Sequence, residues 1–326
     1  MERRGLGIRG LGRYCLAMCM RESELLGHIA RRSTDLTGQG GVLVGPGDDC
    51  AVLAFGGGVL LATVDHLVAG RHFDAASTPL DLVARKAVAR SVSDIAAMGG
   101  TAMFGLATGC LPSGFSRGDE LFDAMSGWAR RFGCPLVGGD IAASDGPMVL
   151  TVTVLGRAHE RRGAVLRSGA RAGDAVYVSG RLGGSLASGR HLTFEPRAEE
   201  GRFLCDALGD SLHAMIDLSD GLGRDAGRVA SASGVRVEFE AAALGACVGE
   251  DRVVLEAEEM IRAVSEGEDY ELLFCVADGA AVPESCPATG TRFTRVGRIV
   301  SGAGCVLVCS GGEAVDIAES GWDHQT

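Results

Sequence analysis

Apolar positions recur with strand or helix spacing along most of the chain, and they predict a β-rich first half and an α/β second half. Residues 59–64 alternate between glycine turns, as a half-buried strand does. Helical spacing predicts a helix over 79–98, and the β-branched run 148–155 predicts a buried strand. Later, a predicted helix over 222–233 is followed by a predicted strand over 235–239. This alternation is typical of α/β architecture.

The change of pattern indicates two domains. An arginine- and glycine-rich stretch, 159–174, lies between the two halves and has the composition of a hinge. We therefore expect an N-terminal domain over 22–156 and a C-terminal domain over 157–326. Residues 1–21 precede the first helical pattern, and their arginines interrupt any apolar run that a signal peptide would need. We interpret them as an N-terminal extension, disordered or resulting from a mis-assigned start.

Composition narrows the classes of protein. The formal net charge of −11 over 326 residues argues against a nucleic-acid binder, because phosphate backbones attract basic surfaces. The apolar runs are too short to span a membrane, so we expect a soluble, cytoplasmic protein without a membrane partner. The 11 cysteines form no Cys-x-x-Cys pair, which favours reduced thiols over zinc or disulfides.

Lysine is almost absent from the chain. Lys86 is the only one, and it lies inside the predicted helix over 79–98. A phosphate-binding Gly-Lys-Ser/Thr loop and a protein-kinase strand lysine are both missing. Any phosphoryl chemistry must therefore depend on metal ions, arginines and backbone amides.

Acidic side chains follow predicted strands at several glycine-rich turns. Asp49, Asp65, Asp140, Asp217 and Asp220 all stand at such positions. An isolated Gly-Asp pair is usually just a turn signal, but loops above one edge of a sheet would bring several of these acids together. Clustered carboxylates repel each other unless cations are present, and their oxygens favour magnesium. The sequence therefore predicts a magnesium-phosphate site. Asp94, on a small-residue face of the predicted helix, is a further candidate ligand or a solvated helix acid.

Six motifs occur in the order found in one family of kinases. The chain resembles the thiamine-monophosphate kinases from about Glu22 to Trp322. The acidic turns alone recur across a wider superfamily, including the aminoimidazole-ribonucleotide and selenophosphate synthetases. The sequences Val68-Ala-Gly-Arg-His-Phe73 and Gly267-Glu-Asp-Tyr-Glu-Leu272 are the more discriminating. The other matching stretches are Gly47 to Leu53, Ser93 to Gly99, Gly138 to Asp140 and Asp217 to Leu222.

This resemblance implies an activity and a fold. It implies direct transfer of the γ-phosphoryl group of ATP onto thiamine monophosphate, giving thiamine diphosphate with the help of several Mg²⁺ ions. The implied fold class is α/β (α+β), a two-domain synthetase-like fold. The N-terminal domain would bind ATP and metal and form a β-barrel across a homodimer, and the C-terminal domain would be an α/β sheet. ATP would lie near the dimer interface.

The resemblance also assigns roles to residues, without any covalent nucleophile. The implied metal ligands are Asp49, Thr63, Asp65, Asp94, Asp140, Asp217 and Asp220. The implied ATP contacts are Gly139, Asp140, Arg167 and Ser219, and the implied contacts to thiamine monophosphate are His72, Glu268 and Trp322.

Several assignments have a purely structural alternative. His72 could be a satisfied histidine at a strand end, Trp322 a packing anchor and Arg167 the partner in a hinge salt bridge. Asp48 and Asp269 are interpreted as cap or turn residues and are left out of the site.

The chain departs from the family pattern in three places. Glu266 replaces a glycine, Ser91 replaces an asparagine, and the span 181–197 is short and is expected to lack a helical insertion. Two alternative functions follow: another ATP-using member of the superfamily, or a degenerate nucleotide-binding dimer. A non-catalytic maturation protein is less favoured, since hydrogenase-maturation relatives end in a cysteine-bearing tail and this chain does not.

Overall fold

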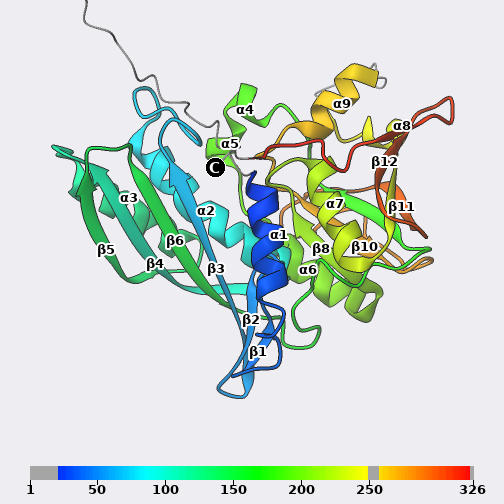
Figure 1. Cartoon of the computed structure of the whole chain (residues 1–326), viewed down its shortest axis with the longest axis horizontal. Helices are drawn as coiled ribbons and strands as arrows, with labels where there is room; N and C mark the ends of the chain where they lie inside the picture. Colours follow the sequence, from blue (N-terminus) through cyan, green and yellow to red (C-terminus); the bar gives the residue numbers. More distant parts are fainter. Residues whose placement is uncertain (1–20, 249–256, 324–326) are drawn as a thin grey trace, which may run out of the picture.

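Two β-sheets, one from each half of the chain, organise the structure (Figure 1). The computed structural model describes residues 21–248 and 257–323, so most of the predicted N-terminal extension lies outside the described residues. The first sheet has six strands in the order β1-β2-β3-β6-β4-β5. Its strands are β1 (Val42–Val44), β2 (Ala51–Phe55), β3 (Gly58–Val68), β4 (Thr101–Pro112), β5 (Leu136–Ser144) and β6 (Val149–Arg157).

One face of the first sheet is covered by helices α2 (Leu80–Ala97) and α3 (Gly118–Arg131), and the other is open. Along β6, Leu150, Val152 and Val154 are buried toward the helices, while the residues between them are only partly covered. The edge strand β5 is exposed over nearly its whole length. Between β1 at one edge and β5 at the other no ladder is formed, so the sheet of the described chain does not close into a barrel. The barrel that we expect requires a second copy.

Helix α2 is the central element of the molecule. It packs on β3, β6 and α3 in the first half and on α5 (Arg190–Thr193), α6 (Ala198–Leu208) and β8 (Leu212–Asp217) in the second. Almost every residue is therefore buried, including Arg85, Lys86, Ser91 and Ser93. The apolar stripe predicted for one face is present, but the polar face is buried as well. This helix carries polar groups from the first half to the second sheet.

The second sheet has seven strands in the order β13-β12-β9-β11-β7-β10-β8. All its pairs are antiparallel except β12 with β9, so this half is closer to α+β than to the alternating α/β pattern that we expected. Besides β8, its strands are β7 (Ala175–Ser179), β9 (Arg236–Glu240), β10 (Leu272–Val276), β11 (Phe293–Val300), β12 (Gly304–Val308) and β13 (Ala314–Asp316).

Helices flank the second sheet on both faces. The core on one face includes α7 (Leu222–Ser233) and α8 (Ala241–Leu244), and on the other it includes α6 together with Ala97 and Val165 from the first half. Helix α7 occupies the residues predicted from the sequence. The span 181–197 holds two one-turn helices, α4 (Ser185–Ser188) and α5. The remaining helices are α9 (Ala257–Ser265) and the 3₁₀ turn η1 (Gly209–Ser211).

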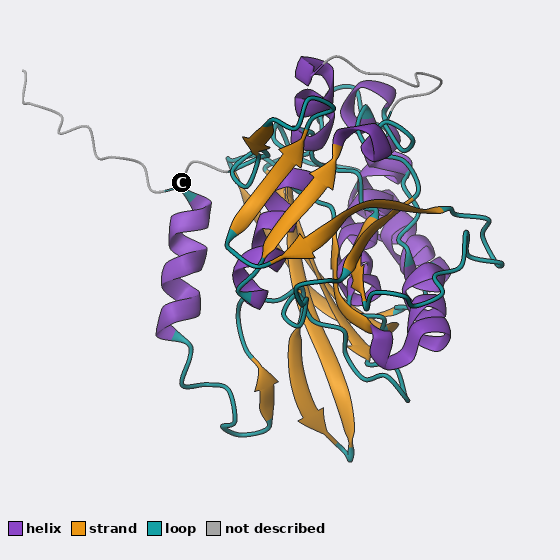
Figure 2. Ribbon diagram, turned by 90° about the vertical axis from the view of Figure 1, so that its right-hand side faces the viewer, coloured by secondary structure: helices purple, strands orange, loops and turns teal. Residues whose placement is uncertain are grey.

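Helix α1 (Glu22–Arg32) stands away from both sheets (Figure 2). None of its residues is buried, and the Ser23 hydroxyl donates to Asp323 Oδ2 at 2.8 Å, which ties it to the C-terminal segment. No helix among the described residues is long and apolar enough to cross a membrane. The cysteines that the structure describes are free thiols, and most are buried.

Candidate active site

Three carboxylates from distant parts of the chain meet between the two sheets. Asp49 precedes β2, Asp94 lies near the end of α2, and Asp217 is the last residue of β8. One oxygen from each lies within 4.8 Å of the others. Asp49 and Asp217 are buried and Asp94 is partly buried. The structure thus brings together three of the six predicted carboxylate ligands.

A serine on α2 joins the two halves at this cluster. The Ser93 hydroxyl donates to Asp217 Oδ2 at 2.6 Å, and both residues are buried. One turn of α2 therefore contributes Asp94 to the cluster and orients Asp217 through the Ser93 hydroxyl. The sequence analysis did not select Ser93, although its position directly before Asp94 in the motif was a usable signal.

The cluster is electrostatically unfavourable when it holds no cation. Burial, together with Asp65 and Asp217, raises the pKa of Asp94 well above its ordinary value. Burial and Asp49 do the same to the pKa of Asp217. Asp49 Oδ2 is buried and accepts no hydrogen bond from any group that the structure describes. Hard carboxylate oxygens held this close, one of them without a donor, fit a divalent cation such as Mg²⁺.

Strand β3 adds two polar groups on the side facing α2. The Thr63 hydroxyl donates to Asp94 Oδ2, so Thr63 belongs to the cluster. Asp65 lies two residues further on the same face of the strand. Its carboxylate is 3.5 Å from Arg90 Nη2, which also lies on α2. Asp65 is therefore at the border of the cluster and is already partly neutralised by an arginine.

Arg167 is the cation nearest to Asp49. Its Nη2 donates to Asp49 Oδ1 at 2.5 Å, and its backbone amide donates to Asp48 Oδ2 at 3.1 Å. The structure thus shows the salt bridge of the structural alternative. It also places a guanidinium at the edge of the group of three carboxylates. Asp48, whose pKa burial and Asp49 raise to about 6, thus accepts the Arg167 amide and also the Asp49 amide.

The turn after β8 carries Ser219 and Asp220, the expected ATP contact and metal ligand. Asp220 is paired with Arg228 of α7, and its backbone amide donates to Asp225 Oδ2 at 3.0 Å. It lies outside the group of three carboxylates. The Trp322 backbone amide donates to the Asp220 carbonyl oxygen at 2.9 Å, which places the C-terminal tryptophan beside this turn with a half-exposed ring.

The loop 266–270 packs directly on the same turn. The amide of Glu268 donates to the Ser219 carbonyl at 2.7 Å. A Cβ on Gly267 would lie 2.7 Å from that oxygen, so only glycine fits there. Glu268 has a φ of 68°, a left-handed conformation that non-glycine residues rarely adopt. Asp269, expected to be a cap or turn residue, is buried and accepts from the Gly183 amide and from Arg190, both far away in the sequence.

His72 follows β3 in a tight turn. Its Nδ1 accepts the Val68 amide at 2.9 Å, which leaves Nε2 as the protonated nitrogen of a neutral ring. Its carbonyl oxygen accepts a hydrogen bond from Lys86 Nζ at 2.9 Å. Lys86 Nζ also lies 2.6 Å from Glu268 Oε2. A single buried lysine thus contacts two of the three residues predicted on the acceptor side.

Asp140 and Gly139 lie away from the cluster. In the strand ladders, Asp140 of β5 lies opposite Thr108 of β4. Thr108 lies opposite Thr151 of β6, and Thr151 lies opposite His66 of β3. Paired residues share a face, and His66 is on the face opposite to Asp65. Asp140 therefore points to the open face, three ladder steps from β3, or roughly 14 Å. A Cβ on Gly139 would lie 1.8 Å from the Ala107 carbonyl, which explains this glycine by strand pairing alone.

Comparison with known proteins settles the family. The family model described as AIR synthase related protein, N-terminal domain, matches residues 47–158, and its C-terminal counterpart matches residues 171–310. A thiamine-monophosphate kinase from Rhodopirellula baltica is 35% identical over 296 residues, covering 87% of this chain and 90% of the relative. That of Escherichia coli strain K12 is 34% identical, covering 87% and 92%. The chain belongs to the thiamine-monophosphate kinase family.

Solved structures of thiamine-monophosphate kinases share the whole fold. One described as AaThiL complexed with AMPPCP and TMP has a TM-score of 0.74 and 29% identity, covering 94% of this chain and 99% of that one. The kinase from Aquifex aeolicus has a TM-score of 0.69, 27% identity and coverage of 91% and 99%. A hydrogenase-maturation protein, HypE in complex with ATP, has a TM-score of 0.64 at 17% identity, which shows a common fold alone.

The three departures from the kinase pattern have structural partners. The Ser91 hydroxyl donates to the Val152 carbonyl at 2.8 Å and holds α2 against β6. The Glu266 carboxylate accepts the Gly184 amide, so the added negative charge is held by the first turn of α4. In this member of the family the short span 181–197 is therefore fastened to the loop that carries Glu268.

Proposed function

We propose that this protein is a thiamine-monophosphate kinase, which transfers the γ-phosphoryl group of ATP to thiamine monophosphate and produces thiamine diphosphate and ADP. One observation carries the proposal: in a chain of this family, Asp49, Asp94 and Asp217 converge within 4.8 Å between the two sheets. When its carboxylates are ionised, such a cluster is stabilised by a bound cation. It lies between the turn that holds Ser219 and the strand that leads to His72.

We propose that the cluster is a magnesium site. Asp49, Asp94 and Asp217 would hold the metal, with Thr63 and Asp65 beside them and Asp220 joining from its pair with Arg228. Bound Mg²⁺ would offset the charge of the carboxylates and of the phosphate oxygens. The buried Asp49 Oδ2, which has no donor among the described residues, supports this assignment.

The chain's own groups would then hold the two substrates in line. On the donor side, Arg167 would exchange its contact with Asp49 for phosphate oxygens, next to Ser219. On the acceptor side, His72, Glu268 and Trp322 would hold thiamine monophosphate. A phosphate oxygen of the acceptor forms the new bond to the γ-phosphorus as the bond to the β,γ-bridging oxygen breaks, and ADP leaves. Positioning and charge stabilisation suffice, so no side chain is phosphorylated.

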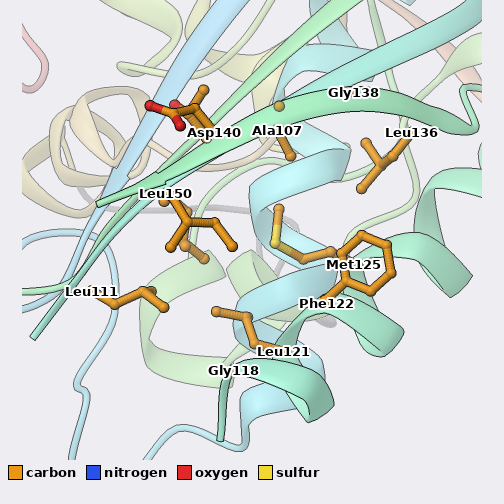
Figure 3. Close-up of a pocket in the computed structure, with 14 residues that line it drawn as sticks. Ala107, Leu111, Gly118, Leu121, Phe122, Met125, Leu136, Gly138, Asp140 and Leu150 are labelled. Atoms are coloured by element: carbon orange, nitrogen blue, oxygen red, sulfur yellow. The ribbon is translucent and has the colours of Figure 1, made fainter. Parts of the chain in front are cut away.

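We propose that two copies form a homodimer through the open face of the first sheet, completing the expected barrel. Val64, Phe104 and Leu106 are exposed on that face, and β5 presents a long unpaired edge. Beside β5, apolar side chains line a groove of 600 Å³ between α3 and strands β4 and β5, with Asp140 at its rim (Figure 3). In a dimer, Gly139 and Asp140 would lie at the interface, where the expected ATP contact would be made.

We also propose a domain boundary at residues 156/157. The first sheet ends with β6 at Arg157 and the second begins with β7 at Ala175, which supports a division here.

A direct assay tests the proposed function. Purified protein is incubated with ATP, MgCl₂ and thiamine monophosphate, and the products are separated by ion-exchange chromatography. Thiamine diphosphate and ADP are expected. No thiamine diphosphate above a control without protein would reject the proposal.

A further inference from the structure

The single lysine of the chain is completely buried. Lys86 lies in the middle of α2, and its side chain has no exposed surface. Burying an ammonium group is unfavourable unless its charge is paired and its three N–H donors are satisfied. Burial lowers the pKa of Lys86, and the neighbouring Glu268 carboxylate acts in the opposite direction. All other long basic side chains in this protein are arginines, so Lys86 carries its only side-chain ammonium group.

The Lys86 ammonium contacts three groups from separate parts of the chain, two through hydrogen bonds and one through an ion pair. Nζ lies 2.9 Å from the His72 carbonyl oxygen, 2.9 Å from His191 Nδ1 and 2.6 Å from Glu268 Oε2. These partners belong to the turn after β3, to α5 and to the loop 266–270. The ammonium thus donates to the His72 carbonyl and contacts His191 Nδ1, while its charge pairs with Glu268, whose buried Oε2 makes this ion pair without an aligned hydrogen bond.

Two of these partners hold the residues that the proposed function assigns to the acceptor. The His72 turn is closed by its own ring, since Nδ1 accepts the Val68 amide. Lys86 Nζ restrains this turn by donating to the His72 carbonyl oxygen. The Glu268 backbone has a φ of 68°. Its amide donates to the Ser219 carbonyl oxygen, and its own carbonyl oxygen accepts from Ser185 Oγ at 2.6 Å. Only the side chain then needs a partner, and Lys86 provides it.

We propose that Lys86 is a positioning residue for the acceptor site, which sets the separation and orientation of His72 and Glu268 and thereby the affinity for thiamine monophosphate. The proposal rests on the proposed function. With Oε2 held by Lys86, the carboxylate of Glu268 is orientated so that Oε1 remains for the substrate. Thiamine monophosphate carries a cationic thiazolium ring, which a fixed carboxylate attracts. Lys86 acts on the acceptor side, because its contacts include none of the residues assigned to ATP or to metal.

The neighbouring residue Arg85 offers a matched control. It is also a buried cation of α2, but it pairs with Glu195 at 2.9 Å and lies over the Trp128 and Phe132 rings. Removal of either cation should lower thermal stability. Only removal of Lys86 should change the acceptor site.

The kinetic test compares Lys86→Met with Arg85→Met. For Lys86→Met we expect the KM for thiamine monophosphate to rise at least about tenfold, with the KM for ATP within about twofold of the unaltered protein. Arg85→Met should leave both KM values within twofold. An unchanged KM for thiamine monophosphate in a folded Lys86→Met protein, or an equal rise in both variants, would overturn the proposal.

A spectroscopic test uses the unaltered protein and needs no variant to fold. Because the chain has one lysine, protein labelled with ¹³Cε,¹⁵Nζ-lysine gives a single lysine side-chain resonance. Thiamine monophosphate should shift that resonance, and a non-hydrolysable ATP analogue with Mg²⁺ should shift it far less. If the protein makes thiamine diphosphate but the resonance does not respond to the acceptor, the positioning role is rejected and the proposed function stands. If no thiamine diphosphate is made and the acceptor does not bind, both are rejected.

Discussion

The backbone amide of Glu268 donates to the carbonyl oxygen of Ser219 at 2.7 Å. The two residues are 49 positions apart in the sequence, and the proposed function assigns one to the acceptor and the other to ATP. Gly267 permits the contact, because a side chain there would collide with the same carbonyl. The donor and acceptor loops are therefore joined through their backbones.

Replacement of Asp94 by Asn should separate stability from activity. Without metal, the change removes one of three carboxylates that repel each other, so Tm should rise by roughly 3 to 6 °C, which corresponds to one or two kcal/mol. Turnover should fall at least about a hundredfold, because a metal ligand is lost. Differential scanning calorimetry in EDTA and the product assay measure the two effects. The control is Asp206→Asn, an exposed acid paired with Arg161 on the surface, which should change neither quantity appreciably. A fall in Tm for Asp94→Asn would contradict the repulsion.

The stability of the metal-free protein should fall as the pH rises. The pKa of Asp48 is raised from 3.8 to about 6, and those of Asp94 and Asp217 are raised further, chiefly by burial. The folded state therefore binds these protons more tightly than the unfolded chain does. Between the unfolded and folded pKa values, deprotonation costs the folded state free energy, so the stabilisation present at low pH is lost.

Magnesium should reverse this dependence, since it binds the deprotonated carboxylates. Thermal melts at pH 6 and pH 8, with and without MgCl₂, are the measurement, and the increase in Tm with Mg²⁺ should be larger at pH 8. An equal increase in an Asp217→Asn protein would show that the ion binds elsewhere.

Replacement of Arg167 by Ala should weaken ATP binding. A charge-assisted hydrogen bond to phosphate contributes roughly 1.5 to 3 kcal/mol, so the KM for ATP should rise about ten- to a hundredfold. Lysine should restore only part of the affinity, because it lacks the planar pair of donors. Initial rates at varied ATP and saturating thiamine monophosphate test this. If the KM for ATP is unchanged and only Tm falls, Arg167 is no more than the partner of Asp49.

Substitution on the open face of the first sheet should break the proposed dimer. Leu106→Asp places a charge at the centre of the exposed apolar face, and light scattering after size exclusion should report a monomer. Leu186→Asp, at an exposed position on α4, is the matched control and should remain a dimer. A monomeric unaltered protein, or a dimeric Leu106→Asp variant, would reject this interface.

The sequence predicted the elements with clear periodicity and failed where burial depends on both halves of the chain. Helix α7 and strand β6 lie close to where they were expected because the apolar positions of each face one core. Helix α2 was predicted with one apolar stripe, yet Lys86 and Ser93 are buried on its other faces. Their partners in β8, α5 and the loop 266–270 are more than a hundred positions away, and no local pattern encodes those contacts.

The candidate site also contains residues that the sequence could predict and residues that it could not. Asp49, Asp94 and Asp217 could be selected because each stands at a turn or on a small-residue face within a recognisable motif. The positions of Asp140 and Asp220 could not be predicted, because strand register decides the face of Asp140 and a salt bridge with Arg228 holds Asp220. Lys86 was noticed as the single lysine, but its contact with Glu268 depends on a loop 182 residues away.

The most direct measurement of the central claim is a single-turnover experiment with [γ-³²P]ATP, Mg²⁺ and thiamine monophosphate, quenched with acid at short times. We predict that the label passes into the terminal phosphate of thiamine diphosphate in a one-to-one ratio with ADP, that no labelled protein accumulates, and that EDTA abolishes transfer. Labelled inorganic phosphate without thiamine diphosphate, or a labelled protein that precedes the product, would contradict direct transfer at this site.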